Sequence, residues 1–455
     1  MRKSIIYVIL SLAVLPGCLD IKLESQFSDP YAITTVATAR ELLASAYNSI
    51  PRFQMEFSIL SDDFVPTSYA SKAADLSNLY RWQEKAIDDL SSQVWNSYYL
   101  TVAYVNALLP RLDNVVPKDE SEALEIEKIR SEAKTLKAIC YFDLLRLYGP
   151  VWSEGNADAD GIILKNRLEL DFLPRSSMKD CVNEIDALLS EAASVENDGT
   201  SVYYLSSSAV NALRAELELY RHDYKEAVRI GLPLLEDAEG RWTSTDYDNL
   251  WSGNDSRERL FAPYIFNTFY VGLNYDRDKG DYFALNSHVI YDEGDVRKAW
   301  CEYAGPQEGV INLGKYNRMY YENTDVRYIN TIRYSGVCFT VAEAYARDGR
   351  PSEAIALMNR YLGARNAVLL DEGLSGEPLV LAILLEKQKE FVGEGIRLFD
   401  LKRLGKPLVR YGSAGNSTSV APDDYRWLFP IPASEYRYND KIVNINPGWP
   451  KQTVD

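Results

Sequence analysis

Apolar residues recur at helical spacing along both flanks of the chain. Leu42, Ala46 and Ile50, for example, follow one another at intervals of four and fall on one face of a helix. Gly149 and Pro150 follow the longest of these patterns and are a strong helix terminator. The spacing predicts helices over residues 36–50, 92–112 and 121–148.

Two later segments share a tighter pattern. Each has two small residues twelve positions apart, with a turn between them, as in tetratricopeptide repeats. Small side chains at these positions let two antiparallel helices pack closely. The pattern predicts helical hairpins over 209–236, with Ala215 and Ala227, and over 335–362, with Ala342 and Ala354.

The region between these hairpins differs from them in composition and periodicity. Residues 240–330 are rich in Tyr and Trp among Gly, Asn and Asp, and their periodicity is short and broken, which is typical of loops with a few strands. Residues 53–90 and 405–428 are also predicted to be loops. We therefore predict a mostly α fold of tetratricopeptide-type hairpins, with an irregular, aromatic-rich insertion of loops and strands.

The first residues carry an export signal. Arg2 and Lys3 precede an apolar run of about ten residues, which as a helix spans only ~15 Å and is too short to cross a bilayer. Leu15-Pro16-Gly17-Cys18 then resembles the bacterial lipobox, in which the cysteine is acylated after cleavage. The other interpretation is a simple signal peptide with an incidental cysteine. We expect a signal peptide over 1–17 and a lipid anchor on Cys18, which ties the protein to a membrane.

Charge and composition exclude some classes of function and favour others. A net charge of −17 opposes nucleic-acid binding, which needs a positive field. With 32 Tyr and 8 Trp, the chain is rich in side chains that combine an apolar face with a polar edge, which suits wet binding surfaces. The two His residues provide little material for imidazole chemistry. The four cysteines after Cys18 lack zinc spacing and do not form a disulfide framework.

Each acidic motif has an ordinary structural or solvent-exposed explanation as well as a functional one. Asp62-Asp63 and Asp423-Asp424 could bind Ca²⁺ or form a glycosidase pair, but acidic loops in so acidic a chain are usually solvated. Asp246-x-Asp248-Asn249 is only a fragment of a calcium-loop pattern. We expect no metal, no cofactor and no catalytic residues. Two pairs spaced three apart on a helix are predicted to be local, structural ion pairs: Glu394 with Arg397, and Asp400 with Arg403.

Several motifs, in order along the chain, resemble the SusD/RagB family of surface lipoproteins from Bacteroidetes nutrient-uptake systems. The match begins after Cys18 and spans nearly the whole length. The residues that carry it are Leu19-Asp20-Ile21-Lys22, a helix from Glu132 through Tyr141-Phe142 to Tyr148-Gly149, Asp295-x-Arg297, Ile332-Arg333-Tyr334, the run from Glu390-Phe391 through Glu394-Gly395-x-Arg397 to Asp400-Leu401-x-Arg403-x-Gly405, Phe429-Pro430-Ile431-Pro432 and Asn446-Pro447-Gly448-Trp449.

The resemblance implies a SusD-like fold over residues 18–455 as a single domain. Helical repeats would cover about 36–236 and 333–405, and a ligand-binding insertion about 240–330. It also implies outer-membrane anchoring, cell-surface exposure and a TonB-dependent SusC-like transporter as partner. The protein would capture oligosaccharide, or in some members peptide, and would carry out no chemistry.

Aromatic loops are the expected ligand surface. Sugar rings stack their C–H faces on flat Tyr and Trp rings, while neighbouring polar groups bond the hydroxyls. Tyr80, Trp82 and Lys85 lie in a loop where, by the resemblance, glycan-binding relatives place stacking residues. The alternative for any single ring is ordinary packing. The predicted ligand-binding residues are Tyr80, Trp82, Lys85, Tyr270, Asn274, Tyr275 and Tyr282.

Three other functions remain open at this level. A peptide receptor on the same fold would share every scaffold motif. An α-helical-barrel glycosidase would also be acidic, exported and rich in aromatics, and it would need a carboxylate pair in a central cleft. A purely structural repeat scaffold would bind no small molecule.

We predict that Cys18→Ala releases the protein from membranes, because its acyl chains are the anchor. Fractionation of cells that produce the wild type and the variant measures this. A variant that stays in the membrane fraction at the wild-type level would show that Cys18 is not lipidated.

Overall fold

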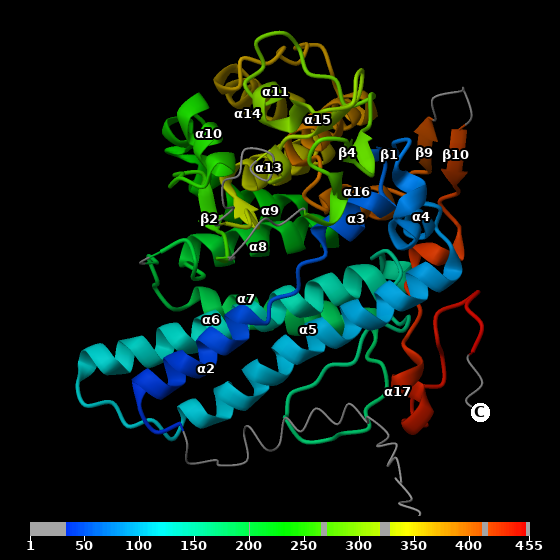
Figure 1. Ribbon diagram of the computed structural model, residues 1–455. Helices are drawn as coiled ribbons and strands as arrows, with labels where there is room; N and C mark the ends of the chain where they lie inside the picture. Colours follow the sequence, from blue (N-terminus) through cyan, green and yellow to red (C-terminus); the bar gives the residue numbers. More distant parts are fainter. Residues whose placement is uncertain (1–32, 200, 265–270, 319–327, 412–416, 452–455) are drawn as a thin grey trace, which may run out of the picture.

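The structure is a computed structural model that describes residues 33–199, 201–264, 271–318, 328–411 and 417–451. The predicted signal peptide and Cys18 lie outside this part. A lower layer contains the long helices, with a second layer of shorter helices above it (Figure 1). The lower layer contains α2 (Val36–Asn48), α5 (Glu84–Leu112), α6 (Glu120–Tyr148) and α7 (Met178–Ala193).

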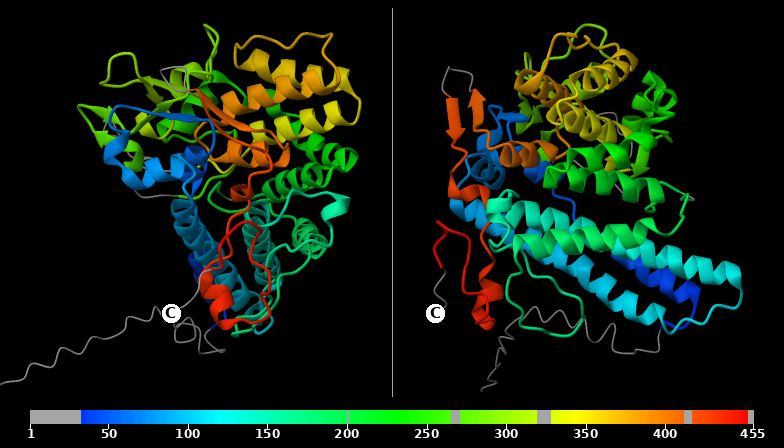
Figure 2. Two further views of the ribbon diagram at one scale, coloured as in Figure 1. Left: turned by 90° about the vertical axis from the view of Figure 1, so that its right-hand side faces the viewer. Right: turned by 180° about the vertical axis from the view of Figure 1, so that it is seen from behind.

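The upper layer is built from helical hairpins. Its helices are α8 (Ser207–Arg221), α9 (Tyr224–Gly231), α13 (Tyr334–Arg347), α14 (Pro351–Ala364), α15 (Gly376–Phe391) and α16 (Ile396–Arg403). The view from behind shows the same two layers, with α5 and α6 running out beneath the shorter helices (Figure 2).

The two predicted hairpins are confirmed. Ala215 of α8 and Ala227 of α9 are fully buried where these helices pack together, and Ala342 and Ala354 are fully buried between α13 and α14. The turn after α8 is made by His222 in a left-handed conformation with φ 66°.

The insertion between the hairpins holds short elements, as predicted. Its helices are α10 (Ser244–Ser252) and α11 (Lys298–Cys301), and its strands are β2 (Arg259–Phe261), β3 (Asn274–Asp276), β4 (Gly280–Asp281), β5 (Phe283–Leu285), β6 (Glu302–Ala304) and β7 (Ile311–Leu313). The pairings among the described residues are antiparallel and two-stranded: β1 (Phe64–Pro66) with β5, β2 with β8 (Ile332–Arg333), β3 with β4, β6 with β7, and β9 (Leu408–Tyr411) with β10 (Ser417–Val420).

Residues 53–90 are more regular than the expected loop. They contain α3 (Gln54–Leu60), α4 (Ala74–Tyr80) and the first turns of α5. The apolar pattern does not reveal α3 and α4 because each is only seven residues long, too short for a clear period, and gains its stability from tertiary packing. The short α17 (Ala433–Tyr438) lies near the C-terminus.

A buried ion network joins the insertion to the upper helices. Arg333 Nη1 lies 2.9 Å from Glu258 and 2.6 Å from Glu390, and its Nη2 lies 2.8 Å from Glu394. These neighbouring carboxylates hold the pKa of Arg333 well above its usual value, against the opposite effect of burial. The residues of the network are Glu258, Lys315, Arg333, Arg365, Glu390 and Glu394.

We predict that Arg333→Met lowers the free energy of unfolding by roughly 3–5 kcal/mol, because it leaves buried carboxylates without their cation. Denaturant unfolding measures the change. Arg229→Ala is the control: its side chain is 66% exposed in a pair with Glu226, and such pairs contribute about 1 kcal/mol or less. Equal small losses for both variants would contradict the central position of Arg333.

Candidate functional site

A single threonine joins two segments that are far apart in the sequence. The Thr67 backbone N–H donates to Tyr282 O at 3.0 Å, and its hydroxyl donates to Asp281 O at 2.7 Å. The same hydroxyl oxygen accepts from the Tyr69 N–H at 3.2 Å. The loop after β1 therefore lies against the β3–β4 hairpin, and Figure 1 shows β1, β4 and α4 close together on one side of the molecule.

This join brings three tyrosine rings together. The Tyr69 and Tyr275 rings stack with centroids 4.6 Å apart and planes 28° apart, and Tyr275 lies 5.5 Å from the tilted Tyr282 ring. All three are half-buried, so each keeps a surface open to solvent. We call Tyr69, Tyr275 and Tyr282, with Lys72, the tyrosine platform.

Lys72 supplies a polar group at the edge of the rings. It lies in the turn before α4 and is exposed. Its Nζ donates to the Tyr275 hydroxyl at 2.7 Å and lies 4.7 Å from the centroid of that ring. This hydrogen bond raises the pKa of Lys72 above its ordinary value. The platform therefore combines flat apolar faces with a cationic donor, which is the chemistry that a polyhydroxylated ring needs.

Asn274 helps to form the hairpin. Its Nδ2 donates to Asp281 Oδ1 at 2.6 Å and to Asn317 Oδ1 at 3.0 Å. Asn317 in turn donates to the other Asp281 oxygen at 2.5 Å. The Asn274 Nδ2 thus positions the hairpin, whereas its Oδ1 has no hydrogen-bond partner among the described residues, so direct contact with a ligand stays a prediction.

The Asp62-Asp63 pair holds the ends of β1 and β5 in place, next to the segments that carry the platform. Asn286, directly after β5, donates its N–H to Asp63 O at 2.8 Å and its Nδ2 to Asp62 O at 2.7 Å. Asp63 Oδ2 accepts from the Gly393 N–H at 3.1 Å. The expectation of solvated acids is wrong here, because Asp63 is fully buried. Burial, with the Asp62 charge beside it, raises the pKa of Asp63 to about 7.

The expectation of an exposed Trp82 ring is wrong. Trp82 is 2% exposed, its Nε1 donates to Leu60 O at 2.9 Å, and its ring meets Trp427 edge-on at 4.6 Å. The reason is the backbone: Trp82 adopts φ 54° just after α4 ends, which turns the ring into the core. The alternation of aromatic and polar residues in the sequence gave no sign of this turn.

Of the remaining predicted residues that the structure describes, one is half-buried and one is exposed. Tyr80 is half-buried, with the Arg410 guanidinium 3.9 Å from its ring centroid and Phe283 at 5.5 Å. Lys85 is exposed on α5 and pairs with Asp89, one turn further along the helix. Tyr270 lies outside the described residues.

Of the six predicted residues that the structure describes, it brings two, Tyr275 and Tyr282, into one solvent-open cluster, with Asn274 next to them in the hairpin. It adds Tyr69 and Lys72, whose proximity depends on a long-range contact that no local pattern reports.

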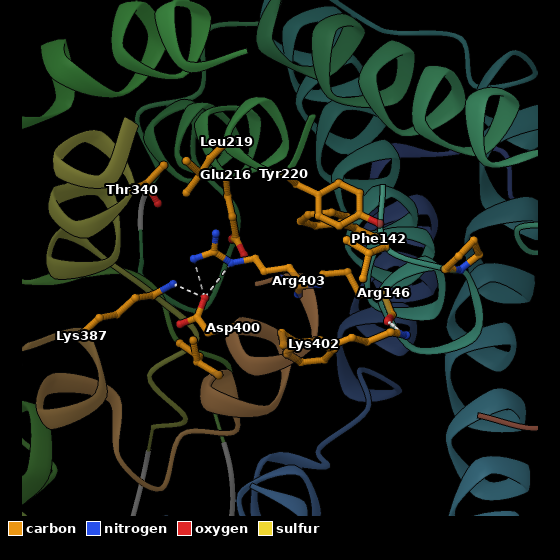
Figure 3. A pocket seen from close by; sticks show the side chains of 14 residues that line it. Phe142, Arg146, Glu216, Leu219, Tyr220, Thr340, Lys387, Asp400, Lys402 and Arg403 are labelled. Atoms are coloured by element: carbon orange, nitrogen blue, oxygen red, sulfur yellow. Dashed lines mark hydrogen bonds and ion pairs between the residues drawn. The ribbon is translucent and has the colours of Figure 1, made fainter. Parts of the chain in front are cut away.

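The C-terminal signature forms a structural joint between the layers. Asp400 lies 3.0 Å from Lys387 and 2.7 Å from Arg403, which confirms the predicted Asp400–Arg403 pair (Figure 3). The predicted Glu394–Arg397 pair is wrong. Gly395 takes a left-handed conformation and starts α16 after Glu394. Arg397 therefore bonds Asp62 at 2.8 Å, while Glu394 bonds Lys315 and Arg333.

Lys402 completes this joint. Its Nζ donates to three carbonyl oxygens at the end of α6, those of Arg146 at 2.5 Å and of Leu147 and Gly149 at 3.1 Å each. Carbonyls at a helix C-terminus lack partners within the helix and carry partial negative charge, so a half-buried lysine N–H donor suits them. The charged groups of this joint are thus bonded within the protein.

The described residues offer neither a metal cluster nor a membrane-spanning helix. Within them, no group of three or more His, Cys, Asp or Glu side chains is placed to hold a metal ion. None of the helices in the described part is both long and apolar enough to span a membrane.

Family models match two long stretches of the chain. One, described as starch-binding and associating with the outer membrane, matches residues 19–219, and the SusD family model matches residues 303–449. A SusD-like protein of Formosa agariphila is 25% identical over 94% of this chain and 97% of its own length. The chain belongs to the SusD/RagB family.

Solved structures share the fold. A SusD superfamily protein from Bacteroides vulgatus, 21% identical, superimposes with a TM-score of 0.79 over 92% of this chain and 100% of its own. A SusD-like carbohydrate binding protein from the same organism, 18% identical, gives 0.76 over 90% of this chain and 98% of its own. The predicted mostly α, SusD-like fold is therefore confirmed.

We predict that Asp63→Asn removes a pH dependence of stability. The folded protein holds the Asp63 proton to about pH 7, whereas an unfolded Asp loses it near pH ~3.9. Wild-type stability therefore falls relative to the variant as the pH rises from about 4 to about 7, by up to ~1.4 kcal/mol per pH unit.

Denaturant unfolding of both proteins across that pH range measures the difference. The control is Asp113→Asn, because the Asp113 side chain is 71% exposed in its pair with Arg130. If the difference in stability between the wild type and the Asp63→Asn variant stays constant with pH, Asp63 is charged in the fold and the prediction is wrong.

Proposed function

We propose that the protein captures glycans at the cell surface, with the tyrosine platform as its binding surface. The observation that carries the proposal is the solvent-open stack of Tyr69 and Tyr275 with Lys72 bonded at its edge. Pyranose rings stack on such faces, and a lysine N–H can donate to a hydroxyl. Family membership adds support, because one matched family is described as starch-binding.

The platform suits binding because its parts are held in advance. The Thr67 bonds fix the Tyr69 loop, and the Asn274–Asp281–Asn317 bonds fix the hairpin that carries Tyr275. A preformed surface loses little conformational entropy when a ligand arrives, so more of the contact energy appears as affinity.

The proposal includes an outer-membrane location and a partner. Cys18 in its lipobox-like setting would carry the anchor, and the matched family is described as associating with the outer membrane. A TonB-dependent SusC-like transporter would receive the captured glycan. We expect the complex to form at the membrane, since anchoring confines the binding protein to the surface where the transporter lies.

We also propose that the protein binds without catalysis. One carboxylate beside the platform, that of Asp281, is fully buried and accepts hydrogen bonds from Asn274 and Asn317. A general acid must reach the leaving group of the substrate, and a carboxylate committed to two amides does not. Its position favours a structural role over glycosidase chemistry.

We predict that Tyr275→Ala weakens oligosaccharide binding by roughly 10–100-fold, because a ring face buries apolar area worth ~1.4–2.8 kcal/mol. Tyr275→Phe keeps the ring, loses the bond to Lys72 and should retain most of the affinity. Calorimetry on a panel of malto-, laminari- and xylo-oligosaccharides, with a parallel panel of short peptides, measures both variants.

Two controls separate binding from folding. Tyr438→Ala removes an exposed tyrosine of α17 and should change neither affinity nor melting. Trp82→Ala should lower the melting temperature, because it empties a core position. Unchanged oligosaccharide affinity in a folded Tyr275→Ala protein would contradict the platform, and binding confined to peptides would replace a glycan receptor with a peptide receptor.

A further inference from the structure

A second group of tyrosines lies away from the platform, beside β2. The Tyr203 and Tyr328 rings stack at 5.4 Å with planes 12° apart, and Tyr264 meets Tyr203 edge-on at 5.7 Å. Tyr328 is fixed from both sides, because its hydroxyl donates to Asp255 at 2.6 Å and the Arg259 guanidinium lies 3.9 Å from its ring centroid. Tyr264 rests on this rigid base and is 49% exposed. Figure 1 shows β2 on the opposite side of the upper layer from β4.

Polar residues lie in the segments that hold this tyrosine group. Arg52 is exposed, and its Nη2 donates to the backbone carbonyl of Tyr264 at 3.4 Å. Asp255, which accepts from the Tyr328 hydroxyl, is exposed in the turn that leads to β2. Like the first platform, the group therefore combines an exposed ring with charged residues in adjoining segments, and its segments are unrelated to those of the platform.

A cavity adjoins this second tyrosine group. Arg52 and Pro263 line it, and Tyr264 follows Pro263 directly. Its volume is about 150 Å³, which is enough for one ring-sized group but below the ~300–1,000 Å³ of most small-molecule sites. Its lining comes from both layers and includes Phe142 of α6 and Phe399 of α16, and Phe399 meets Phe57 edge-on at 5.5 Å.

Two buried polar atoms in the cavity lining lack a protein partner. Among the described residues, none forms a hydrogen bond with Gln54 Oε1 or with Arg146 Nε. The rest of the Arg146 guanidinium is engaged by Asp143 and by Glu216 at 2.7 Å. It also lies 4.2 Å from the centroid of the Phe142 ring, which Figure 3 shows beside it. Gln54 offers an acceptor and Arg146 a donor, and a hydroxyl group matches each of them.

We propose that this cavity and Tyr264 form a second carbohydrate site, which takes the end of a glycan chain. One sugar ring lies on Tyr264, and the terminal unit enters the cavity, where its hydroxyls donate to Gln54 Oε1 and accept from Arg146 Nε. The class of ligand rests on the proposed function, whereas the site itself shares no residue with the tyrosine platform. Two sites on one chain hold a long glycan at two points and raise its avidity without any change in either contact.

The test is calorimetry of the purified protein with maltohexaose, laminarihexaose and xylohexaose. Wild type should show two binding events with at least one of these probes. Tyr264→Ala should remove one event or weaken it about tenfold, and Tyr275→Ala should affect only the other. Gln54→Met keeps the shape of the side chain and removes its acceptor, so it should weaken the Tyr264-dependent event severalfold with unchanged melting. Gln93→Met, on the exposed face of α5, is the matched control.

Each result decides between the sites. A single event that Tyr275→Ala abolishes and Tyr264→Ala leaves intact overturns the second site and keeps the proposed function. An event lost only with Tyr264→Ala supports the second site, even where Tyr275→Ala has no effect and the first platform fails. Unchanged affinity in Gln54→Met overturns the cavity contact and leaves water as its occupant. Binding of none of the probes to the wild type counts against both sites.

Discussion

Six charged side chains that water barely reaches face one another where the insertion meets the upper helices. Glu258, Glu390 and Glu394 alternate with Lys315, Arg333 and Arg365 at distances between 2.5 and 2.9 Å. Removing such charges from water is costly, and the cost is offset only when every charge has its partner in good geometry. Burial alone would raise the pKa of Glu390, but the Arg333 and Arg365 charges lower it to about 2, so this carboxylate stays ionised at neutral pH. The requirement for complete pairing fixes how the loops attach to the helices.

Both proposed binding surfaces depend on that attachment. Lys315 donates to the Glu394 carboxylate and to the Glu390 carbonyl. The Gly393 N–H, next to Glu394, donates to Asp63, and this bond positions β1 and its partner β5 beside the tyrosine platform. On the other side of the upper layer, Glu258 directly precedes β2, and its ion-pair partner Arg333 lies in β8. These two strands pair with each other and lie next to the second tyrosine group. The same network of buried charges therefore supports both groups of tyrosine rings.

Local sequence patterns predicted the parts of the fold that local physics determines. The twelve-residue spacing of Ala215 and Ala227 identified a hairpin because close helix packing needs small residues at those positions. The predictions for Trp82 and for the Glu394–Arg397 pair failed for the same reason. In each case a residue with a left-handed backbone, Trp82 itself or Gly395, turns the chain, so that the side chain contacts residues distant in the sequence. The Tyr69–Tyr275 stack joins segments far apart in the sequence and is made by the Thr67 bonds, so composition could suggest aromatic binding but not its place.

Hydrogen–deuterium exchange with and without a bound oligosaccharide would show whether the tyrosine platform is the surface that binds glycan. We predict slower exchange at residues 67–72 and 274–283, where the platform and its Thr67 bonds lie, and unchanged exchange around Trp82 and Lys402, whose roles are structural. Exchange that slows elsewhere and remains unchanged at residues 67–72 and 274–283 would contradict this prediction.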